Sequence, residues 1–244
     1  MDKTAKRLKQ RRRLEKSAQK REYEDNLVSE FQERCKENNV KLHRKRSDIL
    51  RAYREIETDC LKKAMLISSV CTLYTLRKLY GFGKTRLYRM AVEFTVRIGD
   101  VGQAERKISQ MSEDLKLDAG LDCAAVWDGY TLPDGCKGNP HEIDAVLKSI
   151  PQTIPIIMYA VHLSLGFKKR RMQKVYELTC ASIRLALFTD SIKPYLAELQ
   201  KIGLTVNERG QYIASGKGIE KEHEKFMRRT GGFKNVKNGI HNFK

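Results

Sequence analysis

The sequence predicts a mainly α-helical protein with one short β-hairpin near residues 204–213. Apolar residues recur every three or four positions over long stretches, which is the spacing of an amphipathic helix. Sliding the sequence against itself by 85 residues aligns two similar segments. Turn-forming residues are concentrated in short segments, chiefly between positions 127 and 140. The expected order is a long basic N-terminal helix and then two related three-helix units, which implies an internal duplication.

The first predicted element is one helix over residues 3–36, within a basic helical arm assigned to residues 1–47. The segment contains no Gly or Pro and consists mainly of good helix formers. A narrow apolar stripe, spaced by four, occupies only its second half: Tyr23, Leu27, Phe31 and Cys35. The first half has almost nothing to bury, so we expect a solvated helix there unless an acidic partner lies along it.

A second helix is predicted from Asp48 to about Tyr80, with Ser47 or Asp48 as its N-cap. Its apolar stripe is long: Ile49, Tyr53, Ile56, Cys60, Ala64, Ile67, Cys71 and Tyr74. Such a stripe packs either against the rest of the chain or against another subunit. A homodimer through the helix from Asp48 to Tyr80 is therefore one of two expectations.

The first related unit, together with the long helix, is assigned to residues 48–126. The second related unit is assigned to residues 153–208. At the 85-residue offset, Gly81-Phe82 aligns with Gly166-Phe167, and Lys84-x-Arg86 aligns with Lys169-x-Arg171. In each unit a third helix, near 103–119 and 190–202, ends at a glycine that can adopt a positive φ: Gly120 and Gly203. Chance similarity between helical segments is the alternative to duplication.

The remaining segments connect or follow these units. Residues 127–152 form a turn-rich connector with a short helix expected at 141–150. After Gly203, two short runs at 204–206 and 211–213 predict the hairpin. Residues 209–244 contain the end of the hairpin, a short charged helix at 219–229 and a basic tail that we expect to be flexible.

The basic charge is concentrated at the two ends of the chain. The 244 residues include 48 Lys and Arg against 30 Asp and Glu, a formal net charge of +18. Residues 1–22 carry a net +7 and residues 209–244 a net +6, which together make +13 of the +18. Basic arms usually bind phosphates, because each neutralised phosphate releases counterions. A solvated arm that only adds solubility is the alternative.

The first Gly-Phe turn invites comparison with two phosphate-binding motifs. Gly83-Lys84-Thr85 does not complete a phosphate-binding P-loop, because position 78 is Lys and the preceding segment is helical. Residues 76–87 resemble a helix-hairpin-helix motif, in which the backbone N–H groups of a Gly-apolar-Gly turn contact a DNA phosphate. Leu87 replaces the usual small residue, and Lys168 replaces the second Gly in the other copy. A tight turn with Phe82 and Phe167 filling the core is the structural alternative.

A second resemblance involves the string Leu-Tyr-x-Leu-(x)4-Gly-Phe-Gly-Lys-x-Arg-Leu at residues 73–87. It is similar to a pattern in small proteins encoded by phages and integrated elements of Gram-positive bacteria, over one repeat unit of roughly 50 residues. The resemblance implies a phage or mobile-element origin and a location in the host cytoplasm. It implies no activity and no catalytic residue.

Several classes of function are not supported by the sequence. The longest nearly apolar run, 154–167, is interrupted and too short to span a bilayer, and the first thirty residues lack the apolar segment of a secretory signal. We therefore expect a cytoplasmic protein whose six cysteines are free thiols. No catalytic motif is present, His162 is expected in the core or at its boundary, and neither an enzyme activity nor a cofactor is expected.

The connector offers only weak candidates for metal binding. Cys123, Cys136 and His141 match no closed four-ligand zinc pattern. Three nearby aspartates, Asp122, Asp128 and Asp134, are explained by turn formation.

The leading hypothesis is a non-enzymatic nucleic-acid-binding accessory protein that contacts mainly phosphates of DNA or RNA. The alternative is a protein-interaction modulator or inhibitor of a host enzyme or defence complex. Candidate contacts on the arms are Lys6, Arg7, Lys9, Arg11, Arg12, Arg13, Arg44, Lys45, Arg46, Arg228 and Arg229. Candidate contacts at the repeated turns are Lys84, Arg86, Arg89, Lys168, Lys169, Arg170 and Arg171. The turns themselves depend on Gly81, Phe82, Gly83, Gly166 and Phe167.

Overall fold

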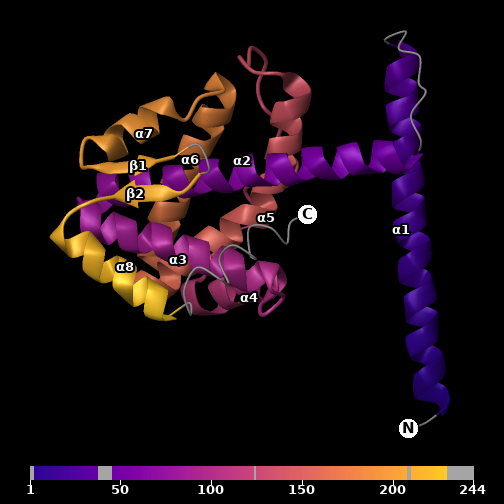
Figure 1. The fold of residues 1–244 in the computed structure, drawn as a ribbon, viewed down its shortest axis with the longest axis horizontal. Helices are drawn as coiled ribbons and strands as arrows, with labels where there is room; N and C mark the ends of the chain where they lie inside the picture. The colour runs from indigo at the N-terminus through magenta and orange to yellow at the C-terminus, as the bar shows by residue number, and fades with distance from the viewer. Residues whose placement is uncertain (1–2, 38–45, 124, 208–209, 230–244) are drawn as a thin grey trace. The chain divides into compact units, whose positions relative to one another are not determined.

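A computed structural model describes residues 3–37, 46–123, 125–207 and 210–229. These residues form eight helices and one two-stranded antiparallel sheet (Figure 1). The mainly helical class with a short hairpin is therefore confirmed. The chain divides into two units, residues 1–58 and residues 59–244, which are described separately.

The first unit contains α1 (Lys3–Glu37) and the beginning of α2 (Arg46–Tyr80). Polar contacts join the two helices: Tyr23 Oη donates to Glu57 Oε1 at 2.6 Å, and Arg54 Nη2 donates to Glu24 Oε1 at 3.0 Å. The side chains described on α1 are mostly solvated, and even its large Leu14 is 63% exposed. The expected long helix with little to bury is thus present.

The second unit has an apolar core built on the C-terminal part of α2. From Cys60 to Cys71 the apolar stripe of α2 is buried, whereas Ile56, one turn earlier, is 56% exposed. The core also includes apolar faces of α3 (Lys84–Gly102), α4 (Ile108–Ala119), α5 (Pro140–Leu165), α6 (Lys169–Thr189) and α7 (Lys193–Gln200). Packing within the chain therefore accounts for the buried part of this stripe, and the homodimer stays a prediction.

Helix α5 differs from the expectation of a separate short helix at 141–150. It is continuous through Pro151 and Pro155, either of which removes a backbone donor and disfavours a helix interior. Burial compensates for this cost, because Ile150 and Ile154 on either side of Pro151 are fully enclosed. A buried hydrogen bond between the hydroxyl groups of Ser68 and Thr153, 3.1 Å apart, also fixes this part of α5 against α2.

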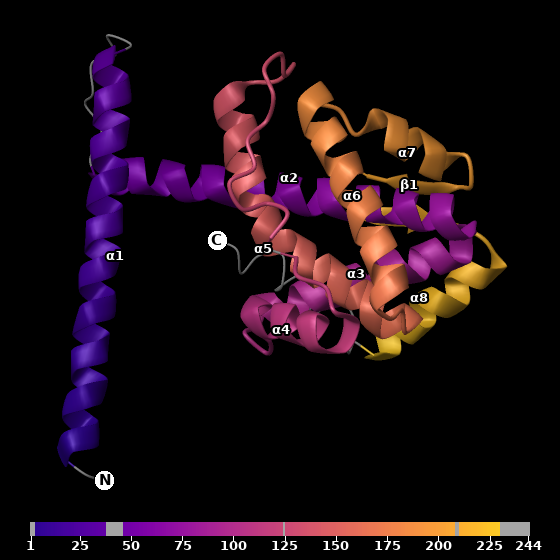
Figure 2. The ribbon, with the colours of Figure 1, turned by 180° about the vertical axis from the view of Figure 1, so that it is seen from behind.

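The hairpin lies beside α3 and α7, and the last helix lies beside α3 (Figure 2). Strands β1 (Leu204–Val206) and β2 (Tyr212–Ala214) are antiparallel, with Leu204 opposite Ala214. Tyr212 places its hydroxyl 2.6 Å from that of Ser69, which ties the hairpin to α2. Helix α8 (Lys217–Arg229) follows β2 and packs on α3.

Candidate nucleic-acid interface

The two Gly-Phe turns, far apart in sequence, lie next to each other in the second unit. The ring of Tyr80 contacts both Phe82 and Phe167, with ring centroids 5.8 and 5.0 Å apart. Phe82 is 7% exposed and Phe167 is 6% exposed, so both rings fill the core beneath the turns. Neither ring is free to stack on a nucleic-acid base.

The backbone of the two turns follows the same course. Gly81 and Gly166 have φ values of +63° and +60°, which favours glycine at both positions. The next helix starts two residues later, at N-cap residues Gly83 and Lys168, with φ of −81° and −96°. Those values are open to any residue, which explains why Lys168 can replace the second glycine. The duplication itself stays a prediction from the sequence.

An arginine lies over each buried phenylalanine. Arg86 is 5.3 Å from the ring centroid of Phe82, and Arg171, its equivalent 85 residues later, is 5.6 Å from that of Phe167. Such contacts favour a cation on the face of an aromatic ring. They hold two guanidinium groups at the surface above the adjoining turns.

Five exposed cations form what we call the turn cluster: Arg86, Lys168, Arg170, Arg171 and Lys174. Within the described part of the chain, no carboxylate pairs with any of them. Several other exposed cations of this unit do have such a partner, as Lys116 has in Asp122 and Lys148 has in Asp144. The turn cluster is therefore a local excess of positive charge.

The positive ends of two helices add to this charge. Neither α3 nor α6 has a side-chain cap on its first N–H groups or an acidic residue in its first turn. Unpaired N–H groups at a helix start carry a partial positive charge, so an anion is favoured there and a cation is disfavoured. Lys168 is the N-cap of α6, so its positive charge is unfavourable for the helix alone and becomes favourable when a phosphate binds there.

Substitution of Lys168 by Ser distinguishes the effect of this lysine on the stability of the protein from its effect on phosphate binding. Lys168→Ser is expected to raise the free energy of unfolding by about 0.5–1 kcal/mol, because Ser can accept a hydrogen bond from the first turn. The same change is expected to weaken nucleic-acid binding about three-fold through loss of one phosphate contact. Chemical denaturation and fluorescence anisotropy measure the two quantities.

Lys107 provides the control, because it is the N-cap of α4, where only Gln110 caps with its side chain by accepting from Lys107 N at 3.2 Å. Lys107→Ser removes the same charge and is expected to stabilise similarly, with little effect on affinity. Equal loss of affinity in both variants would contradict a specific role for the turn cluster.

Three of the candidate residues at the turns already contact other parts of the protein. Lys84 Nζ donates to the carbonyl oxygen of Ser215 at 2.7 Å. Arg89 donates two hydrogen bonds to the carboxylate of Glu222, at 2.9 and 2.7 Å. The side chain of Lys169 lies over the end of α4, where a Cβ added to Gly120 would be 3.0 Å from its Cδ.

One member of the turn cluster, Lys174, is absent from the candidates chosen by sequence. Two signals could have identified it: it follows Arg170 by four residues, which puts both on one helix face, and it aligns with Arg89 at the 85-residue offset.

The candidate residues on the arms that the structure describes lie on α1, α2 and α8. In α1, Arg11, Arg12 and Arg13 are exposed, and Arg11 pairs with Glu15 at 3.2 Å. Lys6, Arg7 and Lys9 lie on the same helix, Arg46 begins α2, and Arg229 ends α8, one residue after the exposed Arg228. Arg44 and Lys45 lie outside the described residues.

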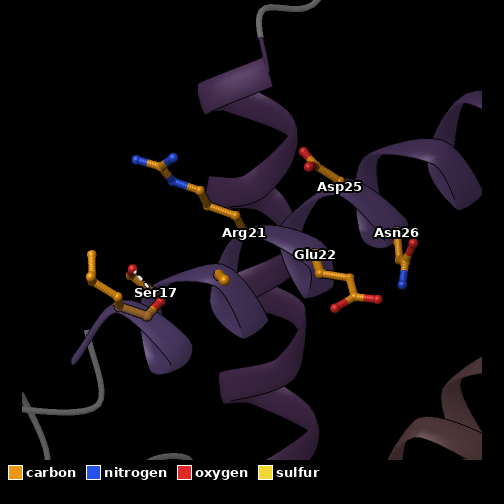
Figure 3. Close-up of a pocket in the computed structure, with 7 residues that line it drawn as sticks. Ser17, Arg21, Glu22, Asp25 and Asn26 are labelled. Atoms are coloured by element: carbon orange, nitrogen blue, oxygen red, sulfur yellow. Dashed lines mark hydrogen bonds between the residues drawn. The ribbon is translucent and has the colours of Figure 1, made fainter. Parts of the chain in front are cut away.

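A hollow along α1 does not suggest a small-molecule site. It is lined by residues of this one helix, with polar and charged side chains that point away from one another (Figure 3). Ser17 Oγ donates to the Leu14 carbonyl oxygen at 2.8 Å, so its hydroxyl bonds within the helix. A hollow with a single wall cannot enclose a ligand.

The groups considered for chemistry by sequence have structural partners. His162 is 7% exposed and its Nδ1 lies 2.8 Å from the Phe167 carbonyl oxygen, in agreement with a core position. Burial raises the pKa of the Cys180 thiol to about 11, and in the described part of the chain Cys71, Cys123, Cys136 and Cys180 are free thiols. In the described ranges, no three His, Cys, Asp or Glu residues are grouped to hold a metal ion.

None of the helices in the described part of the chain combines the length and apolar character needed to cross a bilayer. Comparison with known proteins found no matching family model, no matching curated protein and no matching solved structure.

Proposed function

We propose that this protein is a non-enzymatic accessory factor that binds DNA or RNA through phosphate contacts. The observation that carries the proposal is the turn cluster, whose unpaired cations surround two adjoining helix starts that lack caps and acidic residues. Cations at such a position are unfavourable in the free protein and become favourable when a phosphate neutralises them. The basic half of α1 supplies further contacts in this proposal.

Phosphate contact accounts for these features better than base recognition does. The aromatic rings at the turns are buried, which leaves no stacking platform for bases. Cations alone fix a protein on the backbone without reading the sequence. We place this activity in the cytoplasm of a host cell, as the resemblance to phage and mobile-element proteins implies.

Neutralising the four α6-side cations of the turn cluster tests the proposal. The variant Lys168→Gln, Arg170→Gln, Arg171→Gln, Lys174→Gln is expected to bind a fluorescein-labelled 30-bp duplex about a hundred-fold more weakly near 100 mM salt, at roughly three-fold for each contact. The slope of log affinity against log salt should become shallower by about three to four.

The control neutralises four exposed lysines that already pair with a carboxylate: Lys62, Lys116, Lys148 and Lys201. The charge change is the same, so a general effect of net charge appears in both variants. Loss of affinity in the control as large as that in the turn-cluster variant would contradict the assignment of this surface.

A further inference from the structure

The last helix, α8, covers the start of α3 and not the start of α6. It packs along α3, and among its described side chains Ile219 is enclosed, at 4% exposed. Tyr88 Oη also lies 3.2 Å from Nδ1 of His223. Figures 1 and 2 both show α8 running beside α3. The covered helix start carries two of the basic residues first assigned to phosphate contact, Lys84 and Arg89.

A carboxylate occupies the position that a phosphate would take on Arg89. Glu222 accepts two hydrogen bonds from Arg89, and its side chain is only 11% exposed. Two-pronged binding of an oxyanion by arginine is the geometry used for carboxylates and phosphates alike. These hydrogen bonds lower the pKa of Glu222 below its ordinary value of 4.5, so the pair is fully ionised at neutral pH.

The equivalent positions on α6 have no such cover. Lys169 and Lys174 align with Lys84 and Arg89 at the 85-residue offset. Among the residues that the structure describes, neither has an acidic partner. The two turns therefore differ in one respect that matters for an anion: one helix start is open, and the other holds the protein's own carboxylate.

The attachment of α8 suits a segment that can move. Strand β2 leads into α8 through Ser215-Gly216-Lys217-Gly218, where Gly216 has a φ of +116°. Two glycines within four residues allow large changes in backbone angles. Among the side chains of α8 that the structure describes, Ile219 is buried and the others are partly or fully exposed.

We propose that α8 is an intramolecular competitor whose Glu222 occupies the α3 phosphate site until a nucleic-acid phosphate displaces it. Release frees Arg89 from Glu222 and Lys84 from the Ser215 carbonyl oxygen, so that both turns then contact the same strand. This inference rests on the proposed function and adds to it a second, latent phosphate site and its regulation.

A reversible disulfide between α3 and α8 tests the competition directly. A Cβ at position 218 would lie 3.6 Å from the Cβ of Thr85, within the range of disulfides. The full-length variant Thr85→Cys, Gly218→Cys is compared in its oxidised and reduced forms on the labelled 30-bp duplex. The reduced form should bind about ten-fold more tightly near 50–100 mM salt, with a salt slope steeper by about two, because two cations become free.

Thr85→Cys alone, oxidised in the same way, controls for effects on the native cysteines, and mass spectrometry verifies the crosslink. Equal or tighter binding by the oxidised double variant would overturn the competition while leaving the proposed function intact. Absence of salt-dependent binding in every form would overturn the proposed function, and this inference with it.

A second pair of variants tests the competition without a disulfide. Glu222→Gln and Glu224→Gln each remove one negative charge from α8, but Glu224 is 68% exposed and lies 4.0 Å from its partner Arg228. Competition predicts at least a three-fold larger gain in affinity for Glu222→Gln. Equal gains would show that only net charge matters and would contradict the proposed role of Glu222.

Discussion

Replacing the ten Lys and Arg residues between Lys3 and Arg21 with Gln is expected to weaken nucleic-acid binding by roughly two hundred-fold near 100 mM salt. Only one acidic residue, Glu15, lies in that stretch. If about half of the ten cations contact phosphates, the slope of log affinity against log salt becomes shallower by roughly four to five. Gln is a good helix former, so circular dichroism should show α1 retained.

The matching control exchanges Lys for Arg and Arg for Lys at the same ten positions. Charge is conserved, and phosphate contacts that carry no sequence information should tolerate the exchange. The swapped protein is therefore expected to keep its affinity within a few-fold and its salt slope unchanged. A loss as large as that of the Gln variant would indicate side-chain-specific recognition and contradict simple phosphate contact.

The second large effect concerns stability. Phe167→Ala is expected to lower the free energy of unfolding by about 3–5 kcal/mol, because a buried ring is replaced by a cavity. The ring also contacts Tyr80 and supports Arg171. Urea denaturation followed by circular dichroism measures the change. The control Leu185→Ala, on an exposed part of α6, should alter stability by no more than about 0.5 kcal/mol.

The variant Phe167→Leu distinguishes two possible roles of the Phe167 ring: filling the core and contacting a nucleic-acid base. Leu keeps most of the apolar volume and should retain a folded protein whose affinity for the duplex is unchanged. A stable Phe167→Leu protein that had lost binding would show that the ring itself contacts nucleic acid.

Much of the fold followed from helical periodicity and turn chemistry. The long first helix and the hairpin after Gly203 were expected from local pattern, as was the apolar stripe of α2, although not that its burial begins at Cys60. The continuity of α5 was not, because Pro151 and Pro155 are unfavourable locally and only long-range burial around Ile154 outweighs them.

The candidate site was less accessible to sequence reasoning. The 85-residue offset identified both Gly-Phe turns, but their contact through Tyr80 depends on how α2 and α5 pack together. Likewise, nothing local to Arg89 indicates its pairing with Glu222, which lies 133 residues later in the chain. A charge count along the sequence treats such a residue as free.

The dependence of affinity on salt tests the central claim most directly. Binding of the full chain to a labelled 30-bp duplex and to a 30-nucleotide RNA is measured by anisotropy between 50 and 300 mM salt. Contact through the turn cluster and the basic half of α1 predicts a steep linear fall of log affinity against log salt, with a slope of about −7 or steeper on the duplex. Affinity that does not change with salt, or no binding to either nucleic acid at 50 mM salt, would contradict the account.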